Sequence, residues 1–222
     1  SQFSGHGMPL AIDAGDADDF SVSSGILYGE RFMVGQGTSQ MHISDVDFFS
    51  TSADEMRPAV DVRCEGQCTL EHTDIHSPTV GVSWSGSGTS FMDNVSVYAV
   101  EQAVEASGSG HAVWTNLTVN ASNTGLSVQT PTSALTEVYV ELTANQAIGI
   151  DLLGGQHDWS DVVVEKAFTS TDQTSIGLNA WYSDLTLDQF TSRNVSTGMV
   201  LEDSTAVVQS VEANIGSLAG LH

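Results

Sequence analysis

Hydrophobic and polar residues alternate along most of this chain in short runs that recur at a regular spacing. From about residue 40 onward, one pattern returns: apolar, any, acidic or amide, apolar, any, apolar. Residues 43–48 and 114–119 are clear copies. Alternation of this kind is typical of a strand with one buried face. The central apolar residues of the copies are Val46, Ile75, Val95, Leu117, Val138, Val162, Leu185 and Val211.

A second pattern lies between these copies: Gly or Ala, apolar, any, apolar. Three successive steps of this pattern are 22 residues each. Such short strands cannot form a stable sheet alone, but equivalent strands stacked about 4.8 Å apart would share a continuous core. We therefore expect an all-β fold, a right-handed parallel β-helix of about eight coils with roughly 22-residue repeats. The first apolar residues of this pattern are Val60, Val82, Val104, Leu126, Ile150, Leu178 and Met199.

The third position of the first pattern is mostly acidic or amide. Asp and Asn side chains bond nearby backbone amides and tolerate unusual backbone angles, so this column predicts a bend in each coil. In the degenerate copy at residues 72–77, the pattern places His72 inward and Asp74 in the bend. The column reads Asp45, Asp74, Asn94, Asn116, Glu137, Asp161, Asp184 and Ser210.

The repeats divide the chain into three parts. Residues 39–213 are expected to form the β-helix. Residues 1–38 are expected to form an N-terminal cap or partner-binding arm, which could include an imperfect first coil. Residues 214–222 are expected to form a C-terminal cap, because an open solenoid has to cover its terminal strands.

The charge balance is strongly acidic, with 28 Asp and Glu against 5 Lys and Arg and a net charge of −23. This self-repulsion destabilises a compact chain unless salt screens it, and at molar salt the Debye length is only about 3 Å. The composition is typical of proteins from halophilic archaea and their viruses. It disfavours nucleic acid and anionic membranes as partners. No run of apolar residues is long enough for membrane insertion.

The two cysteines, Cys64 and Cys68, lie close together around Gly66. A disulfide across this turn suits an oxidising, extracellular location. Two free thiols in a loop are the alternative, and a metal site is less favoured because the chain has no second cysteine pair.

The repeat at residues 40–213 resembles the right-handed parallel β-helix superfamily, which includes pectate lyases, polygalacturonases and phage tailspikes. That resemblance implies an architecture and leaves the function open. The polygalacturonase Gly-His-Gly has a counterpart only at Gly5, His6 and Gly7, at the extreme N-terminus. Neither Lys166 nor Arg193 lies in a recognisable catalytic motif of these enzymes.

Acidic side chains recur at outward positions of the second pattern, at Asp61, Glu105 and Asp151. Members two coils apart would be separated by about 9.6 Å along the stack. This is near the upper limit of the carboxylate spacing in inverting glycosidases, about 6.5–9.5 Å. The three residues are candidate catalytic groups, although a chain with 28 acids also produces such pairs by chance.

Two segments carry candidate metal ligands, although no cofactor is required. The oxygen-rich N-terminal segment could hold calcium or another hard cation, or could be a solvated acidic turn. A second set of His and Asp side chains, at alternate positions of one strand, could bind a transition metal. The alternative is that these histidines have a structural role. The first set is Asp13, Asp16, Asp18 and Asp19, and the second is His72, Asp74 and His76.

Four Asn-X-Ser/Thr sequons occur. Asn94 and Asn116 fall in the bend column, which leaves Asn120 and Asn194 as the better candidates for N-glycosylation in an extracellular protein.

The combined pattern favours a non-enzymatic extracellular protein with a structural or attachment role. We expect a virion surface spike, turret or tail-fibre component of a haloarchaeal virus that binds host surface glycan or glycoprotein. The absence of a signal-like segment favours this version over a cell-surface adhesin. The other alternative is a secreted polysaccharide lyase or glycoside hydrolase of a halophile. We further expect homo-oligomers and contacts with other virion or surface proteins.

Overall fold

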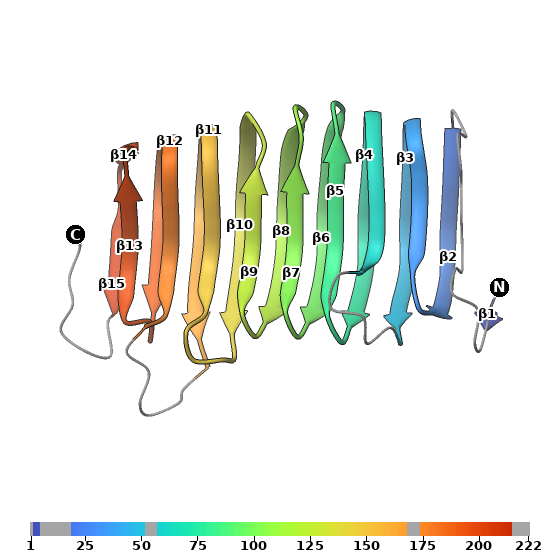
Figure 1. The fold of residues 1–222 in the computed structure, drawn as a ribbon, viewed down its shortest axis with the longest axis horizontal. Helices are drawn as coiled ribbons and strands as arrows, with labels where there is room; N and C mark the ends of the chain where they lie inside the picture. Colours follow the sequence, from blue (N-terminus) through green and yellow to red (C-terminus); the bar gives the residue numbers. More distant parts are fainter. Residues whose placement is uncertain (1, 5–18, 52–56, 168–173, 215–222) are drawn as a thin grey trace.

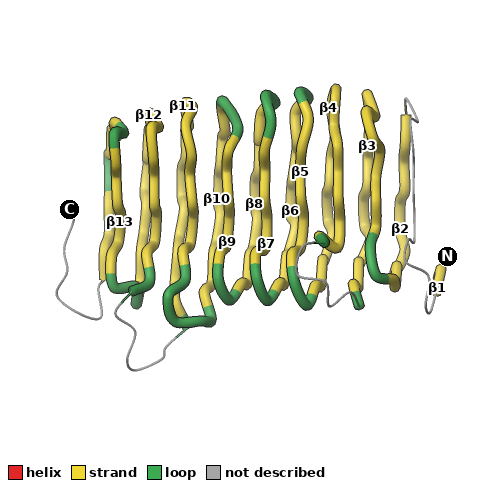
Figure 2. The backbone as a smooth tube through the Cα atoms, viewed as in Figure 1, coloured by secondary structure: helices red, strands yellow, loops and turns green. Residues whose placement is uncertain are grey.

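The computed structural model describes residues 2–4, 19–51, 57–167 and 174–214, which form strands and no helix (Figure 2). Every pairing between strands is parallel, within one 15-stranded sheet. The strands are β1 Gln2–Ser4, β2 Asp19–Gly29, β3 Phe32–Ser50, β4 Pro58–Ser77, β5 Val80–Gly86, β6 Thr89–Ala99, β7 Gln102–Ser107, β8 His111–Ala121, β9 Thr124–Gln129, β10 Thr132–Leu142, β11 Ile148–Lys166, β12 Ile176–Arg193, β13 Thr197–Glu202, β14 Thr205–Val208 and β15 Val211–Asn214.

The sheet winds into a solenoid of about eight coils with three faces, which we call A, B and C. Strands β5, β7, β9 and β13 lie in face A. Strands β6, β8 and β10 each cross face B, bend once and continue through face C. Long strands such as β4 pass through all three faces. The coils therefore lie side by side along the long axis, with the described ends of the chain at opposite ends of the stack (Figure 1).

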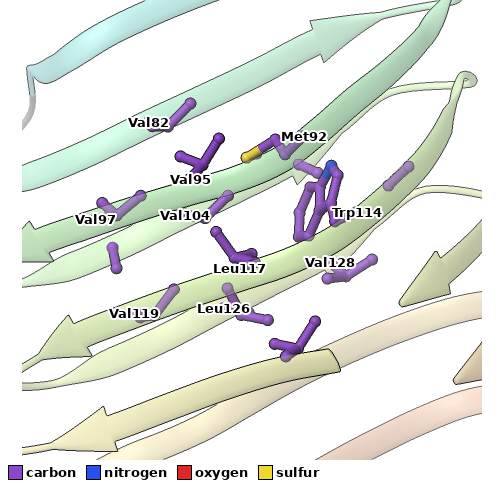
Figure 3. Packing of buried hydrophobic residues seen from close by; sticks show 14 of the residues in the cluster. Val82, Met92, Val95, Val97, Val104, Trp114, Leu117, Val119, Leu126 and Val128 are labelled. Carbon is purple, nitrogen blue, oxygen red and sulfur yellow. The ribbon is translucent and has the colours of Figure 1, made fainter. Parts of the chain in front are cut away.

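The core column predicted for face A is confirmed. Its residues pair with one another from coil to coil, and none is more than 3% exposed. Figure 3 shows part of this column packed against the inward side chains of the other faces. Burial along the whole axis supplies the hydrophobic stabilisation that no single coil could provide. The column contains Phe32, Val60, Val82, Val104, Leu126, Ile150, Leu178 and Met199.

A single residue with positive φ makes the bend between faces B and C. The predicted bend residues Asp45, Asn94, Asn116, Glu137 and Asp161 have φ values between 51° and 55°. One left-handed residue turns the strand direction without interrupting the pairing on either side. Asn and Asp tolerate this conformation better than other non-glycine residues, which explains much of the column.

The register predicted for residues 72–77 is wrong. His72, with φ 49°, is exposed and makes the bend, so Asp74 does not. Thr73 points inward and pairs with Val95, which places Ile75 opposite Val97. The Thr73 hydroxyl donates to the Glu71 carbonyl oxygen over 2.9 Å, so a polar side chain fits this buried position.

The assignment of Leu185 and Asp184 to these columns is also wrong. Leu185 pairs with His157 in face B, and Phe190 pairs with Val162. Gln189, with φ 61°, makes the bend. The prediction failed here because apolar and polar residues alternate in the same way on both sides of the bend, so the pattern around Leu185 does not show where the bend lies.

Part of the N-terminal segment, which could include an imperfect first coil, takes part in the stack. Strand β2 pairs with β3 along faces B and C, and β1 pairs with β2, so ordered stacking includes residues before 39. At the other end, β13, β14 and β15 each pair only with β12 among the described strands. The described residues include no helix with the length and hydropathy needed to cross a membrane.

Candidate functional site

The carboxylates Asp61, Glu105 and Asp151 lie in one outward column of face A. The register places Ser83 between the first two and Ser127 between the last two. Asp61 forms an ion pair with Arg31, and Asp151 accepts a hydrogen bond of 2.8 Å from Asn179. Both carboxylates thus tie neighbouring coils together, and this pairing gives each of them a structural role.

The structure describes only some of the metal-ligand candidates. Asp13, Asp16 and Asp18 lie outside the described residues. His72 makes the bend and is exposed, Asp74 is exposed two residues later, and His76 lies between two aromatic rings. Across the described part of the chain, no three His, Cys, Asp or Glu side chains converge as a metal site would require.

Asp19 begins β2 and, with His42, borders a groove of about 330 Å³ on the N-terminal part of face B. His42 lies 3.1 Å from Glu71. This second groove has its charged neighbours on separate coils, where they pair across the stack.

Cys64 and Cys68 form a disulfide in β4, with 6.0 Å between their Cα atoms. The bridge spans the corner between faces A and B, and both cysteines are at most 3% exposed. It closes the tight corner around Gly66.

The two sequon asparagines already use the amide nitrogens that a glycan would modify. Asn120 donates to Glu141 over 2.6 Å, and Asn194 donates to the Lys166 carbonyl oxygen over 3.4 Å. Glycosylation at either residue would replace an existing contact between coils.

Another hollow lies on the outer side of face B. Its lining contains none of the predicted site residues, although it includes Asp184, which was predicted to make a bend. It is an open groove of about 710 Å³. Its lining crosses six coils, from Thr89 to Thr205, so it follows the solenoid axis for about 24 Å. Several outward side chains along its floor are small, such as those of Val113 and Ala134. The floor therefore lies lower than the neighbouring column of larger polar side chains.

Polar side chains form one edge of this groove. They are successive members of one column in face B: Thr89, His111, Thr132, Gln156, Asp184 and Thr205. His111 is hydrogen-bonded to Thr132, and Thr205 donates to Asp184. The sequence carried a signal for this column, since its first four members each lie three residues before the first apolar residue of the repeated pattern.

A buried hydrogen-bond network supports the groove floor. The Trp159 indole nitrogen donates to Ser133 Oγ over 2.8 Å, and Ser133 Oγ lies 2.8 Å from His157 Nδ1. His157 Nε2 lies 2.6 Å from the Gly154 carbonyl oxygen. Because a carbonyl can only accept, Nε2 carries the hydrogen and Nδ1 accepts from Ser133.

This Ser–His pair has the contacts of a nucleophile and a base, but its setting favours a structural role. Ser133 and His157 are only 5% and 3% exposed. Ser90 accepts the indole hydrogen of Trp114 over 3.2 Å, as Ser133 does for Trp159, so the serine serves a repeated tryptophan contact. Burial lowers the pKa of His157, partly opposed by the bond to Gly154, so the imidazole is neutral near pH 7.

Large exposed side chains lie on the corner next to the polar column, on the side away from the groove floor. Tyr182 is 61% exposed and Trp181 is 36% exposed, in the segment of β12 just before Asp184. Leu153, 49% exposed, pairs with Trp181 from the previous coil. Tyr182 also has φ 53°, which is unusual for a bulky residue. An exposed aromatic side chain held in a strained conformation is more often associated with binding than with packing.

A different aromatic group lies on face C. Tyr28, Phe49, His76 and Tyr98 stack with ring centroids 4.6–5.1 Å apart and planes within 18° of parallel. Rings stacked along the axis cover one another's faces and present mainly edges to solvent. The group therefore stabilises the contacts between coils.

Comparison of this chain with protein-family models, curated proteins and solved structures found no match. The candidate site thus depends on the geometry of the chain alone.

Proposed function

We propose that this protein is a non-enzymatic extracellular attachment protein, a surface spike, turret or tail-fibre component of a haloarchaeal virus. In this proposal it belongs to the right-handed parallel β-helix superfamily and binds glycan or glycoprotein on the host surface. A cell-surface adhesin would have the same physical properties but a cellular origin.

The continuous stack is the observation that carries the proposal. Parallel pairing extends from β1 to β15 (Figure 1), and the core column of face A pairs from coil to coil between Phe32 and Met199. Such a rod resists bending and holds surface side chains at fixed spacing, which suits an attachment fibre. Its flat outer faces would also pack against other copies or other virion proteins.

The charge of the protein supports a very salty environment. A net charge of −23 on 222 residues repels itself strongly in dilute buffer. The only lysine, Lys166, is 1% exposed and donates to Asn145 over 3.0 Å, so the positively charged side chains exposed on the described surface are arginines. We expect the melting temperature to rise steadily between about 0.1 M and about 3 M salt as screening increases.

The enzymatic alternative requires free carboxylates on face A. A secreted lyase or hydrolase would use Asp61, Glu105 and Asp151, yet Asp61 pairs with Arg31 and Asp151 with Asn179. These contacts support the structural interpretation of the column and weigh against the alternative.

The test of the proposal is the native mass of the protein in about 3 M salt, measured by light scattering, together with binding of the labelled protein to haloarchaeal cells. A defined oligomer that binds cells is the expected result. A monomer that binds no cells would contradict the spike function. Screening of polysaccharides for cleavage, with Asp61, Glu105 and Asp151 replaced in turn, would then test the enzymatic alternative.

A further inference from the structure

We propose that the groove on the outer side of face B binds an uncharged linear oligosaccharide, laid along the solenoid axis over the floor column that contains Ala134 and Asp158, with the polar column along one side. The Trp181–Tyr182 corner lies next to that polar column and would contact the ligand across it. This inference rests on the proposed attachment function and names the surface and the ligand class that would carry it.

The size and course of the groove fit an extended chain. Its volume of about 710 Å³ falls in the usual range of ligand sites, about 300–1,000 Å³. It is open along its length and follows the axis for about 24 Å. An elongated, open groove accommodates one stretch of a longer polymer, whereas a compact metabolite would leave most of its surface in solvent.

The lining offers the chemistry that sugar hydroxyls need. Among the described residues, the side chains of Gln156 and Asp158 have no hydrogen-bond partner and are exposed at the groove. An amide and a carboxylate can together donate to and accept from a pair of neighbouring hydroxyls. The hydroxyls of Thr132 and Thr186 extend this set to the adjoining coils.

The Trp181–Tyr182 corner, next to the polar column, offers an apolar surface for the C–H face of a sugar ring that extends over this column. Tyr182 and Trp181 are exposed beside the polar column. The positive φ of Tyr182 sets the direction in which its side chain leaves the backbone. Aromatic side chains supply a large apolar surface at a low entropic cost because they have few rotatable bonds. The inner rings of the face C stack, Phe49 and His76, lack this ability, since neighbouring rings cover both of their faces.

Charge decides between classes of glycan. Asp158 and Asp184 both line the groove, and the described lining contains neither lysine nor arginine. A uronate or sulfate polymer would bring like charge to these carboxylates, on a chain that already carries a net charge of −23. An uncharged chain meets no such repulsion, and its affinity should change little between about 0.5 M and about 3 M salt.

The floor of the groove is rigid because buried contacts fix it from below. Trp159, Ser133, His157 and Gly154 are linked by successive hydrogen bonds of 2.6–2.8 Å. This network holds the strand segments that carry Ala134 and Asp158 outward, so a ligand would meet a surface that is already in its binding conformation.

The experiment measures binding of the full chain by titration calorimetry in about 0.5 M and about 3 M salt. The probes are uncharged oligomers of glucose, mannose and N-acetylglucosamine, with polygalacturonate and a sulfated glycan as anionic probes. Ala134→Phe fills the groove, and Phe91 in the same column shows that face B accepts this side chain. Thr118→Phe adds the same bulk on face C as the matched control.

A second pair of variants tests the corner. Tyr182→Gly removes the ring and retains the positive φ, while Gln189→Gly makes the same change of backbone at another positive-φ residue of β12. We expect Ala134→Phe and Tyr182→Gly each to weaken binding of an uncharged oligomer by about tenfold or more, and both controls to bind as the wild type does.

Three results would overturn the inference: binding of the anionic probes alone, binding of no probe, or equal affinity in wild type, Ala134→Phe and Tyr182→Gly. Cell binding separates this inference from the proposed function. Cell binding that survives in Ala134→Phe refutes the groove while the attachment function stands. Glycan binding in the groove without cell binding refutes the attachment function while the groove stands.

Discussion

The corner between faces A and B allows a sharp test of the stacking geometry. A Cβ atom added at Gly110 would lie 1.9 Å from the carbonyl oxygen of Gly88 in the previous coil. Ordinary contact would require the two coils to separate by about 1.5 Å, more than a quarter of their spacing of about 4.8 Å. Backbone hydrogen bonds oppose this, because His111 N donates to Gly88 O over 3.0 Å. Gly110→Ala should therefore disrupt the corner.

The expected loss follows from the groups left without partners. A buried donor or acceptor that loses its hydrogen bond costs about 1–3 kcal/mol, so one broken donor–acceptor pair with its distorted neighbours costs about 3 kcal/mol. For a chain of this length this corresponds to a fall in melting temperature of about 6–12 °C. Circular dichroism in about 3 M salt measures it.

Gly154→Ala is the matched control. Gly154 has φ +70°, and no atom lies within 4 Å of an added Cβ. Gly154→Ala therefore introduces conformational strain without a steric clash. We expect it to lower the free energy of unfolding by about 1 kcal/mol and the melting temperature by about 2–4 °C. A Gly110→Ala protein that melts within about 1 °C of wild type, or that loses no more stability than Gly154→Ala, would refute the close-approach argument.

Three further changes test other parts of the structure. Glu137→Asn replaces a poorly suited residue at φ 55° with a better one, so the free energy of unfolding should rise by about 0.5–1 kcal/mol in chemical denaturation; a loss of stability would contradict this. Burial lowers the pKa of His157 below 6.5, so its contribution to stability is present above about pH 6.5 and is lost as the pH falls. Wild type should therefore lose more stability than His157→Leu between about pH 7 and about pH 5, and parallel pH curves would refute this. Replacing Cys64 and Cys68 by alanine should lower the free energy of unfolding by about 2 kcal/mol, since the closed loop is short; an unchanged denaturation midpoint would show that the corner is held without the bridge.

The sequence predicted the solenoid because its evidence is distributed over the whole chain. The face A column from Val60 to Met199 was correct at every coil, since glycine or alanine precedes each strand at nearly constant spacing. The bend column was correct at Asp45, Asn94, Asn116, Glu137 and Asp161, and it was wrong at Asp74 and Asp184. A repeated local preference of this kind survives the variation of any single coil.

The register failed where a residue's neighbours in other coils decide its direction. His72 and Gln189 make bends that their residue types do not reveal, and Thr73 is buried because it stacks on Val95. Pairing between coils is a long-range property. The sequence of an alternating strand fits the repeated pattern equally well when the pattern is shifted past a bend.

The candidate site shows the same division. The sequence by itself determined the parallel stack, the outward carboxylate column of face A and the acidic surface, because each follows from residue type and spacing. Only the tertiary structure revealed that Asp61 and Asp151 already have partners on neighbouring coils. It alone revealed the groove of face B, because a hollow depends on the relative heights of side chains that stacking brings together from six coils.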